Sequence, residues 1–154
     1  NLVVSIQQHQ EEDLLKRALH AASIRRLERE AIERAEVLLG MVGLAHLRHE
    51  RAESLVYGQR KLLEFVCALA PDPDLILLDE PAAGVNTAMV DQMKRHILEV
   101  NKQGKTFLIV EHNMGVVMDI SQRIVVLDYG EKIAEGTPAE IQQDQRVREA
   151  YFGK

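Results

Sequence analysis

Three short apolar runs, separated by helical stretches, place the strongest limit on what this chain can fold into. They read LILL at residues 75–78, TFLIV at residues 106–110 and IVVL at residues 124–127. Continuous apolar runs of this length are typical of strands buried on both faces, as in parallel sheets. The segments between them have the length and apolar spacing of helices. This alternation predicts an α/β fold with a mostly parallel sheet and flanking helices.

Proline and glycine mark the limits of these elements. A helix is expected from Arg60 to Leu69, stopped by the prolines at 71 and 73, and another from Thr87 to Gln103, ended by Gly104. The remaining expectations are a short helix over 114–120, a hairpin turn at Tyr129-Gly130-Glu131, a strand over 132–134 and a last helix opened by Pro138.

The first third of the chain has a different spacing of apolar residues. From about Gln10 to Leu47 apolar residues recur every three or four positions, which predicts helix. They are Leu15, Leu19, Ala22, Leu27, Ala31, Ala35 and Leu38. Charges of both signs lie between them, as on a solvated helix face, and Gly40 and Gly43 end the pattern. We therefore expect a helical subdomain over residues 1–53 and an α/β core over residues 54–154.

Composition excludes several classes of function. The net charge is −5, from 19 basic and 24 acidic residues, which argues against a nucleic-acid partner. Cys67 is the only cysteine, so an internal disulfide is impossible, and its apolar neighbours predict a small buried residue. No apolar stretch approaches the roughly 18 residues that cross a bilayer. The apolar start at Leu2, without a methionine, leads us to expect a piece of a longer chain.

Three local patterns carry possible chemistry. Asp79 and Glu80 follow the first apolar run, at the strand edge where open α/β sheets bind ligands, and such carboxylates can hold Mg²⁺ or polarise a water. Gly58 precedes a helix, whose N-terminus attracts anions. His112 follows the second run and can contact a phosphate. Taken alone, each pattern also fits an ordinary loop.

The order and spacing of these patterns resemble one family. The run SLVYGQRKLLEFVCALAPDPDLILLDEPAAGVN is similar to the core of ABC ATPases, in which a signature pentapeptide precedes a helix, the Walker B strand and the D-loop. A histidine one strand later completes the order. The resemblance covers nearly the whole chain and implies a partial ABC-type nucleotide-binding domain.

The resemblance implies roles for individual residues. Asp79 matches the Walker B aspartate that supports Mg²⁺, through water, and Glu80 the catalytic carboxylate that activates the attacking water. His112 matches the catalytic switch histidine that senses the γ-phosphate. Residues 83–86 match the D-loop, which contacts the partner subunit.

The signature implies nucleotide binding in trans. Val56, Tyr57, Gly58 and Gln59 match its last four positions, which in this family close over ATP held by a second subunit. Val56 stands where a serine is usual and has no hydroxyl for a phosphate, which puts the strength of this closure in doubt. Tyr57 replaces a glycine. Asn86, also expected at the nucleotide, replaces the usual D-loop aspartate.

A phosphate-binding loop is missing from these residues. The one Gly-Lys-Thr, at 104–106, has glutamate at position 99 where the P-loop pattern needs glycine, and a strand rather than a helix follows it. We interpret it as a turn. By the resemblance, Walker A and the Q-loop lie upstream of Asn1, and we expect this chain alone to bind ATP weakly or not at all.

The segments YGQRKLLE, DEPAAGVN and EAYFG resemble the ATP-binding subunits of branched-chain amino-acid importers. That resemblance implies ATP and Mg²⁺ as cofactors, a second ATP-binding subunit and an integral membrane permease as partners, and a cytoplasmic location at the inner face of the plasma membrane. Two alternatives stay open: a part of a soluble ABC ATPase that does not transport, and a non-catalytic module that completes a partner's ATP site.

Overall fold

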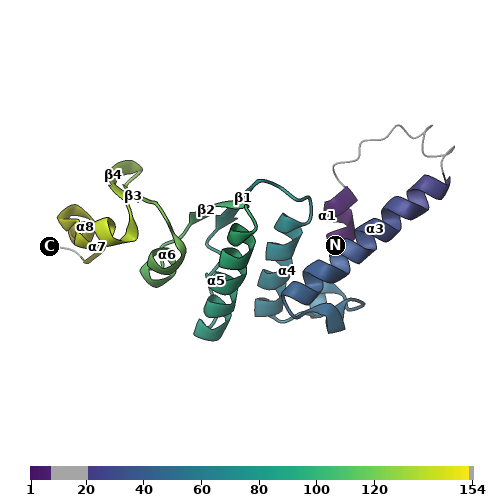
Figure 1. Ribbon diagram of the computed structural model, residues 1–154. Coiled ribbons are helices and arrows are strands. Elements are labelled where there is room, and N and C mark those ends of the chain that lie inside the picture. The colour runs from purple at the N-terminus through teal and green to yellow at the C-terminus, as the bar shows by residue number, and fades with distance from the viewer. Residues whose placement is uncertain (8–20, 153–154) are drawn as a thin grey trace. The chain divides into compact units, whose positions relative to one another are not determined.

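A computed structural model of the chain describes residues 1–7 and 21–152 (Figure 1). The elements in chain order are α1 (Leu2–Gln7), α3 (Ala21–Met41), η1 (Ala45–Leu47), η2 (Ala52–Ser54), α4 (Tyr57–Leu69), β1 (Leu75–Asp79), α5 (Thr87–Lys102), β2 (Thr106–Val110), α6 (Met114–Ile120), β3 (Ile124–Asp128), β4 (Glu131–Gly136), α7 (Pro138–Gln143) and α8 (Gln145–Phe152). They form two compact units, Asn1–Ile109 and Val110–Lys154.

The first unit opens with the helical zone that the sequence predicts. Helix α3 buries Ala31 and Ala35 on one face, where it contacts α1 and α4. It ends shortly before Gly43, whose φ of +75° is a conformation that suits glycine. The helix is therefore confirmed over residues 21–41, while Leu15 and Leu19 lie outside the described residues. The expected division at residues 53 and 54 falls inside this unit and stays a prediction.

The core of the first unit joins α4, α5 and the sheet of β1 and β2. Phe65 of α4 stacks on Phe107 of β2 at 6.3 Å and on His96 of α5 at 6.4 Å between ring centroids. Such aromatic contacts add to the stability that burial itself provides. Strands β1 and β2 pair in parallel, so the α/β class is confirmed.

The burial of the strands differs from expectation. Ile76 is 2% exposed, but Leu75 and Leu77 on the opposite face of β1 are 51% and 67% exposed. Phe65 of α4 packs against Phe107 of β2, whereas the face of β1 that carries Leu75 and Leu77 remains largely exposed among the described residues. The expectation of strands buried on both faces is therefore wrong for this chain.

Cys67 also differs from expectation. It is half-buried rather than part of the core, although desolvation still raises the pKa of its thiol. Contact with Ser5 of α1 accounts for part of this shielding.

The second unit contains the predicted hairpin. Strands β3 and β4 pair antiparallel from Ile124 opposite Gly136 to Asp128 opposite Glu131, with one irregularity after Val126. Its core consists of buried side chains from the hairpin, α7 and α8: Ile124, Ala134, Ile141 and Val147.

The last helix of the prediction is two helices. Thr137 caps α7, in which Pro138 takes the first position, as expected. The chain then breaks at Asp144, whose Oδ1 accepts hydrogen bonds from the N–H groups of Arg146 at 2.8 Å and Val147 at 3.4 Å. This side-chain capping starts α8 as a separate helix, which periodicity alone does not reveal.

Among the helices of residues 1–7 and 21–152, none combines the length and the apolar character that a bilayer-spanning segment requires.

Candidate functional site

The expected catalytic carboxylates lie at the carboxyl end of β1. Asp79 is the last residue of the strand and Glu80 follows it, and both side chains are exposed. Glu80 has a φ of +44°, which is strained for a residue other than glycine. Strained backbone of this kind concentrates at functional sites. The geometry therefore presents two acidic groups at a ligand-binding edge, with Glu80 held in a conformation that local sequence preference does not favour.

The signature residues form the first turn of α4. The helix begins at Tyr57, three residues earlier than the sequence suggests, and Val56 precedes it in an extended conformation. Valine has no acceptor to cap the helix, but Oε1 of Gln59 accepts the backbone N–H of Val56 at 3.1 Å. The first N–H groups of a helix have no partner within the helix and carry the positive end of its dipole. This turn therefore suits an anion.

Gly58 faces the start of α5. A Cβ at Gly58 would come within 2.8 Å of the terminal methyl of Met89. The absence of a side chain thus lets the first turn of α4 approach α5 closely. Because the methyl is the flexible end of Met89, an alanine here would displace a side chain and leave the backbone in place.

The expected D-loop, residues 83–86, connects the carboxyl end of β1 with the first turn of α4. Its turn begins with a hydrogen bond from the N–H of Ala83 to the carbonyl of Glu80 at 3.0 Å. The hydroxyl of Tyr57 donates to the carbonyl of Ala83 at 3.1 Å. Asn86 caps α5, since its Oδ1 accepts the N–H of Met89 at 2.9 Å. The structure thus gives Asn86 a local structural role, and its contact with nucleotide stays a prediction.

His112 lies in the second unit, on the loop between β2 and α6, and its side chain is exposed. The carboxylate of Glu111 accepts the N–H groups of His112 at 3.0 Å and Asn113 at 3.1 Å. Asn113 caps α6 by accepting the N–H of Val116 at 3.3 Å. These contacts fix the backbone of the histidine loop from both sides.

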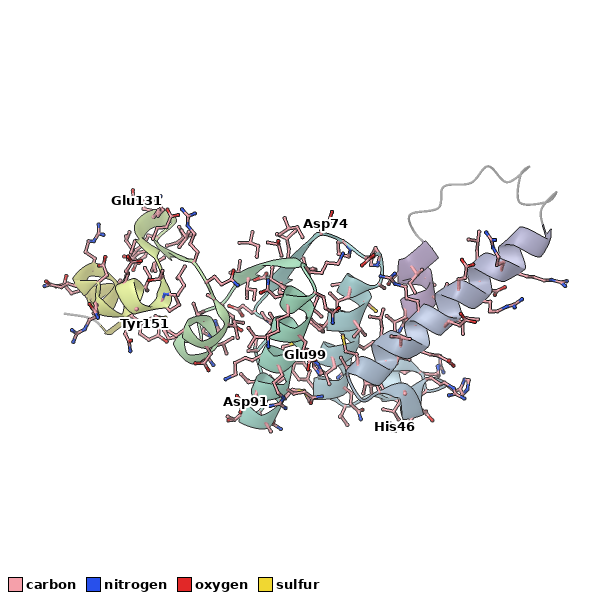
Figure 2. All side chains as sticks on the ribbon, viewed as in Figure 1. His46, Asp74, Asp91, Glu99, Glu131 and Tyr151 are labelled. Atoms are coloured by element: carbon pink, nitrogen blue, oxygen red, sulfur yellow. The ribbon has the colours of Figure 1, made fainter. Side chains whose placement is uncertain are left out.

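Tyr151, labelled in Figure 2, is a residue that sequence reasoning missed. Its hydroxyl on α8 donates to the carbonyl of His112 at 3.3 Å. The two residues are 39 positions apart, so no local pattern links them. The ending EAYFG, which resembles the importer ATP-binding subunits, is the sequence feature that contains this tyrosine.

The Gly-Lys-Thr segment is a turn, as the sequence indicates. Gly104 has a φ of +95° and strand β2 follows at Thr106. The ammonium of Lys105 contacts the carboxylates of Asp72 at 3.0 Å and Asp74 at 3.7 Å, and donates to the carbonyl of Asp72 at 3.3 Å. Figure 2 labels Asp74 near the start of β1. This lysine is therefore engaged in structure at the amino end of the sheet.

Arg34 completes this acidic turn. It lies 3.4 Å from the carboxylate of Asp72 and, at the same distance, donates to the carbonyl of Leu69. The hydrogen bond and charge of Lys105, followed by the charge of Arg34, lower the pKa of Asp72 below its ordinary value. Helix α3, the end of α4 and the turn before β2 are thus joined by one group of charges, which we call the Asp72 cluster (Arg34, Asp72, Asp74, Lys105).

The residues present fit part of a Mg²⁺–ATP site. The first turn of α4 suits a phosphate and Asp79 offers carboxylate oxygens, the ligand type that Mg²⁺ prefers. Across residues 1–7 and 21–152, no group of three or more histidine, cysteine or acidic side chains is arranged to hold a metal. Asp79 is thus one part of a possible magnesium site, and a complete binding set requires further groups.

A hollow of about 330 Å³ lies in the helical zone of the first unit. Side chains from α1, α3 and the two short 3₁₀ helices line it, including Leu2, Ile32, Leu39, Leu44 and Leu55. Charged residues also contribute, among them Glu36 of α3 and Arg48, which directly follows η1. The hollow is mostly apolar, with a few charged groups in its lining.

Comparison with known proteins identifies the class. The sequence matches the ABC transporter family over residues 2–83, more than half of the chain. The chain belongs to this family. Within it, residues 131–154 match the family described as branched-chain amino acid ATP-binding cassette transporter.

Relatives agree with this placement. The chain is 36% identical over 155 residues to the high-affinity branched-chain amino acid transport ATP-binding protein LivG of Escherichia coli, and 37% identical over 155 residues to BraF of Pseudomonas aeruginosa. Each alignment covers 100% of this chain and 61% of the relative, so the chain spans about three fifths of their length.

A solved structure shares the fold. The ADP conformation of MJ1267, an ATP-binding cassette of an ABC transporter, superposes with a TM-score of 0.77 at 31% identity. The match covers 99% of this chain and 63% of the other.

Proposed function

We propose that this chain is the C-terminal part of an ATP-hydrolysing subunit that drives ABC-type import of small molecules, in particular branched-chain amino acids. The observation that carries the proposal is the continuous connection from the first turn of α4, through residues 83–86, to the carboxylates at the end of β1. The names of LivG and BraF support the substrate class.

Each site residue has a role in this proposal. Asp79 would hold Mg²⁺ through water, and the bound ion would supply neutralisation of charge on the phosphates. Glu80 accepts a proton from the attacking water, and His112 orients the γ-phosphate and that water. The first turn of α4, with Val56, Tyr57, Gly58 and Gln59, and the D-loop with Asn86 face the ATP of a second subunit.

The assembly follows from these roles. A second ATP-binding subunit completes each site, and an integral membrane permease receives the mechanical work. The hollow beside α3 supports a docking place for such a permease. The subunit would then act on the cytoplasmic side of the plasma membrane, attached through that partner.

Hydrolysis by the longer subunit that contains these residues tests the proposal. Glu80→Gln removes the proton acceptor with little change in shape, and we expect kcat to fall by about 100-fold or more. Glu131→Gln is the matched control, because Glu131 is an exposed glutamate at the turn of the β3–β4 hairpin. Equal activity of the two variants would contradict the catalytic role of Glu80.

The isolated chain provides a second test. A calorimetric titration with Mg²⁺–ATP should give no binding at micromolar concentrations, because its sequence contains no P-loop pattern and Lys105 is engaged by acidic residues. Binding at that strength would reveal a phosphate site other than the one proposed. Capture of a polytopic membrane protein by the longer subunit would separate the transport role from that of a soluble ABC ATPase.

A further inference from the structure

The first turn of α4 and the D-loop meet through one side chain, that of Tyr57. Its hydroxyl donates to the carbonyl of Ala83 at 3.1 Å, across 26 positions of sequence. A tyrosine reaches this carbonyl because the aromatic ring spans the gap that a shorter side chain leaves open. The hydroxyl is thus committed to the backbone of its own chain.

Gly84 lies close to the ring of Tyr57. A Cβ built on Gly84 would lie 3.2 Å from the tyrosine oxygen and 3.3 Å from Cε1. Gly84 also has a φ of +70°, which side chains disfavour. Two independent features, the space and the backbone conformation, therefore both require glycine where the tyrosine passes.

The ring of Tyr57 has a second close neighbour, Lys61. The ammonium of Lys61, one turn along α4, lies 5.9 Å from the centroid of the ring, within the range of a cation–π contact. The same helix is anchored in the core by Phe65 and Val66, which are 3% and 0% exposed. The hydrogen bond therefore connects the D-loop to a rigid helix.

We propose that Tyr57 is a positioning residue that fixes the D-loop to the signature turn, so that these two segments move as one body. The inference rests on the proposed function, in which both segments face a second subunit, and it assigns Tyr57 a role different from direct contact with nucleotide. A displacement of the first turn of α4 is then transmitted to residues 83–86, next to Glu80.

Hydrogen exchange in the chain itself tests the connection without any nucleotide. In Tyr57→Phe, which keeps the ring and loses the hydroxyl, amides of residues 83–86 should exchange about three- to tenfold faster, as expected for the loss of one neutral hydrogen bond. Tyr129→Phe is the matched control because Tyr129 is fully exposed. Unchanged exchange over 83–86 in Tyr57→Phe would overturn the proposal.

Gly84→Ala tests the connection from the opposite side. The new methyl group should displace the ring and speed exchange at the amide of Arg60, which donates to the carbonyl of Val56 in the first turn of α4, as well as in the D-loop. A change confined to the D-loop would overturn the proposal, because it would show that the two segments open separately. Thermal unfolding of both variants verifies that each remains folded.

Kinetics of the longer subunit give a readout that a purely structural role would leave unchanged. Tyr57→Phe should lower kcat by about three- to tenfold while KM for ATP stays within about twofold, because the loop position changes and the phosphate contacts do not. A higher KM with unchanged kcat would overturn the proposal in favour of direct nucleotide contact. If the native subunit shows no hydrolysis, the proposed function fails, and the exchange experiments still decide whether Tyr57 fixes the D-loop.

Discussion

The two ends of strand β1 carry acidic residues in contrasting settings. At the amino end, Asp72 and Asp74 contact Lys105, and Arg34 adds a second cation. At the carboxyl end, Asp79 and Glu80 are exposed and the backbone of Glu80 is strained. Acidic residues in contact with cations contribute modestly to stability, whereas the carboxyl end of a strand in an open α/β sheet is the edge at which such folds bind ligands. The same residue types thus serve stability at one end and, by our proposal, catalysis at the other.

The largest effect is expected at the carboxyl end. Asp79→Ala in the longer subunit should lower Mg²⁺-dependent ATP hydrolysis by about 10- to 100-fold, the usual effect of removing a group that holds a metal through its outer shell. The melting temperature should change little, because Asp79 is exposed. A large loss of thermal stability in this variant would break the contrast between the two ends.

At the amino end the effect should fall on stability. Asp72→Asn keeps a residue that tolerates the φ of +61° observed there and removes only the charge. We expect the free energy of unfolding to decrease by about 1 kcal/mol, near the upper limit for exposed ion pairs, since two cations are involved. Urea unfolding measures it, with Asp74→Asn as control, because Asp74 is fully exposed and lies farther from Lys105. If the free energy of unfolding decreased more in Asp74→Asn than in Asp72→Asn, Asp74 would be the main contributor to the stability of the cluster.

The positive φ at Glu80 predicts that glycine is tolerated at this position better than alanine. Glu80→Gly should be more stable than Glu80→Ala by about 0.5 kcal/mol. Glycine adopts a φ of +44° without the steric conflict of a Cβ, which favours the folded glycine variant. The greater conformational entropy of glycine in the unfolded chain offsets part of this gain. Both variants lose the carboxylate, so the comparison isolates the backbone. An alanine variant of equal or greater stability would indicate that the positive φ costs nothing here.

The smallest effect concerns pH. The pKa of Asp72 is lowered by Lys105 and Arg34, so the unfolded state binds its proton first as the solution is acidified. The stability that the Asp72 cluster provides should be complete above the ordinary pKa of about 3.9 and disappear as pH falls through the lower folded value. The difference in unfolding free energy between the native chain and Asp72→Asn should thus be constant from about pH 7 to 5 and shrink in stronger acid. A difference that persists at about pH 2 would exclude the charge as its source.

Local signals in the sequence identified the elements around the site well. The start at Thr87 and the stop at Gly104 define α5, and the turn at Tyr129 and Gly130 joins β3 to β4. These features depend on neighbouring residues, so a single sequence reveals them. The first turn of α4 was placed too late because Val56 cannot cap a helix and Gly58 weakens one.

Contacts between distant residues could not be predicted in this way. Tyr57 with Ala83, Tyr151 with His112 and Lys105 with Asp72 join positions 26, 39 and 33 residues apart. Each depends on where the folded backbone places a carbonyl group, which residue type and spacing do not encode locally. The burial of β1 could not be predicted for a related reason. An apolar run indicates that both faces of a strand favour burial, but it does not show whether another element of the chain covers each face.

The exposed face of the β1–β2 sheet has a practical consequence for handling this chain. Leu75, Leu77 and Leu108 are 51%, 67% and 55% exposed. Exposed apolar side chains that lie together promote aggregation of concentrated samples and binding by chaperones during expression. Leu77→Lys would place a charge where the leucine contributes little to the core, and we expect it to raise the yield of dispersed protein without loosening the packing around Ile76.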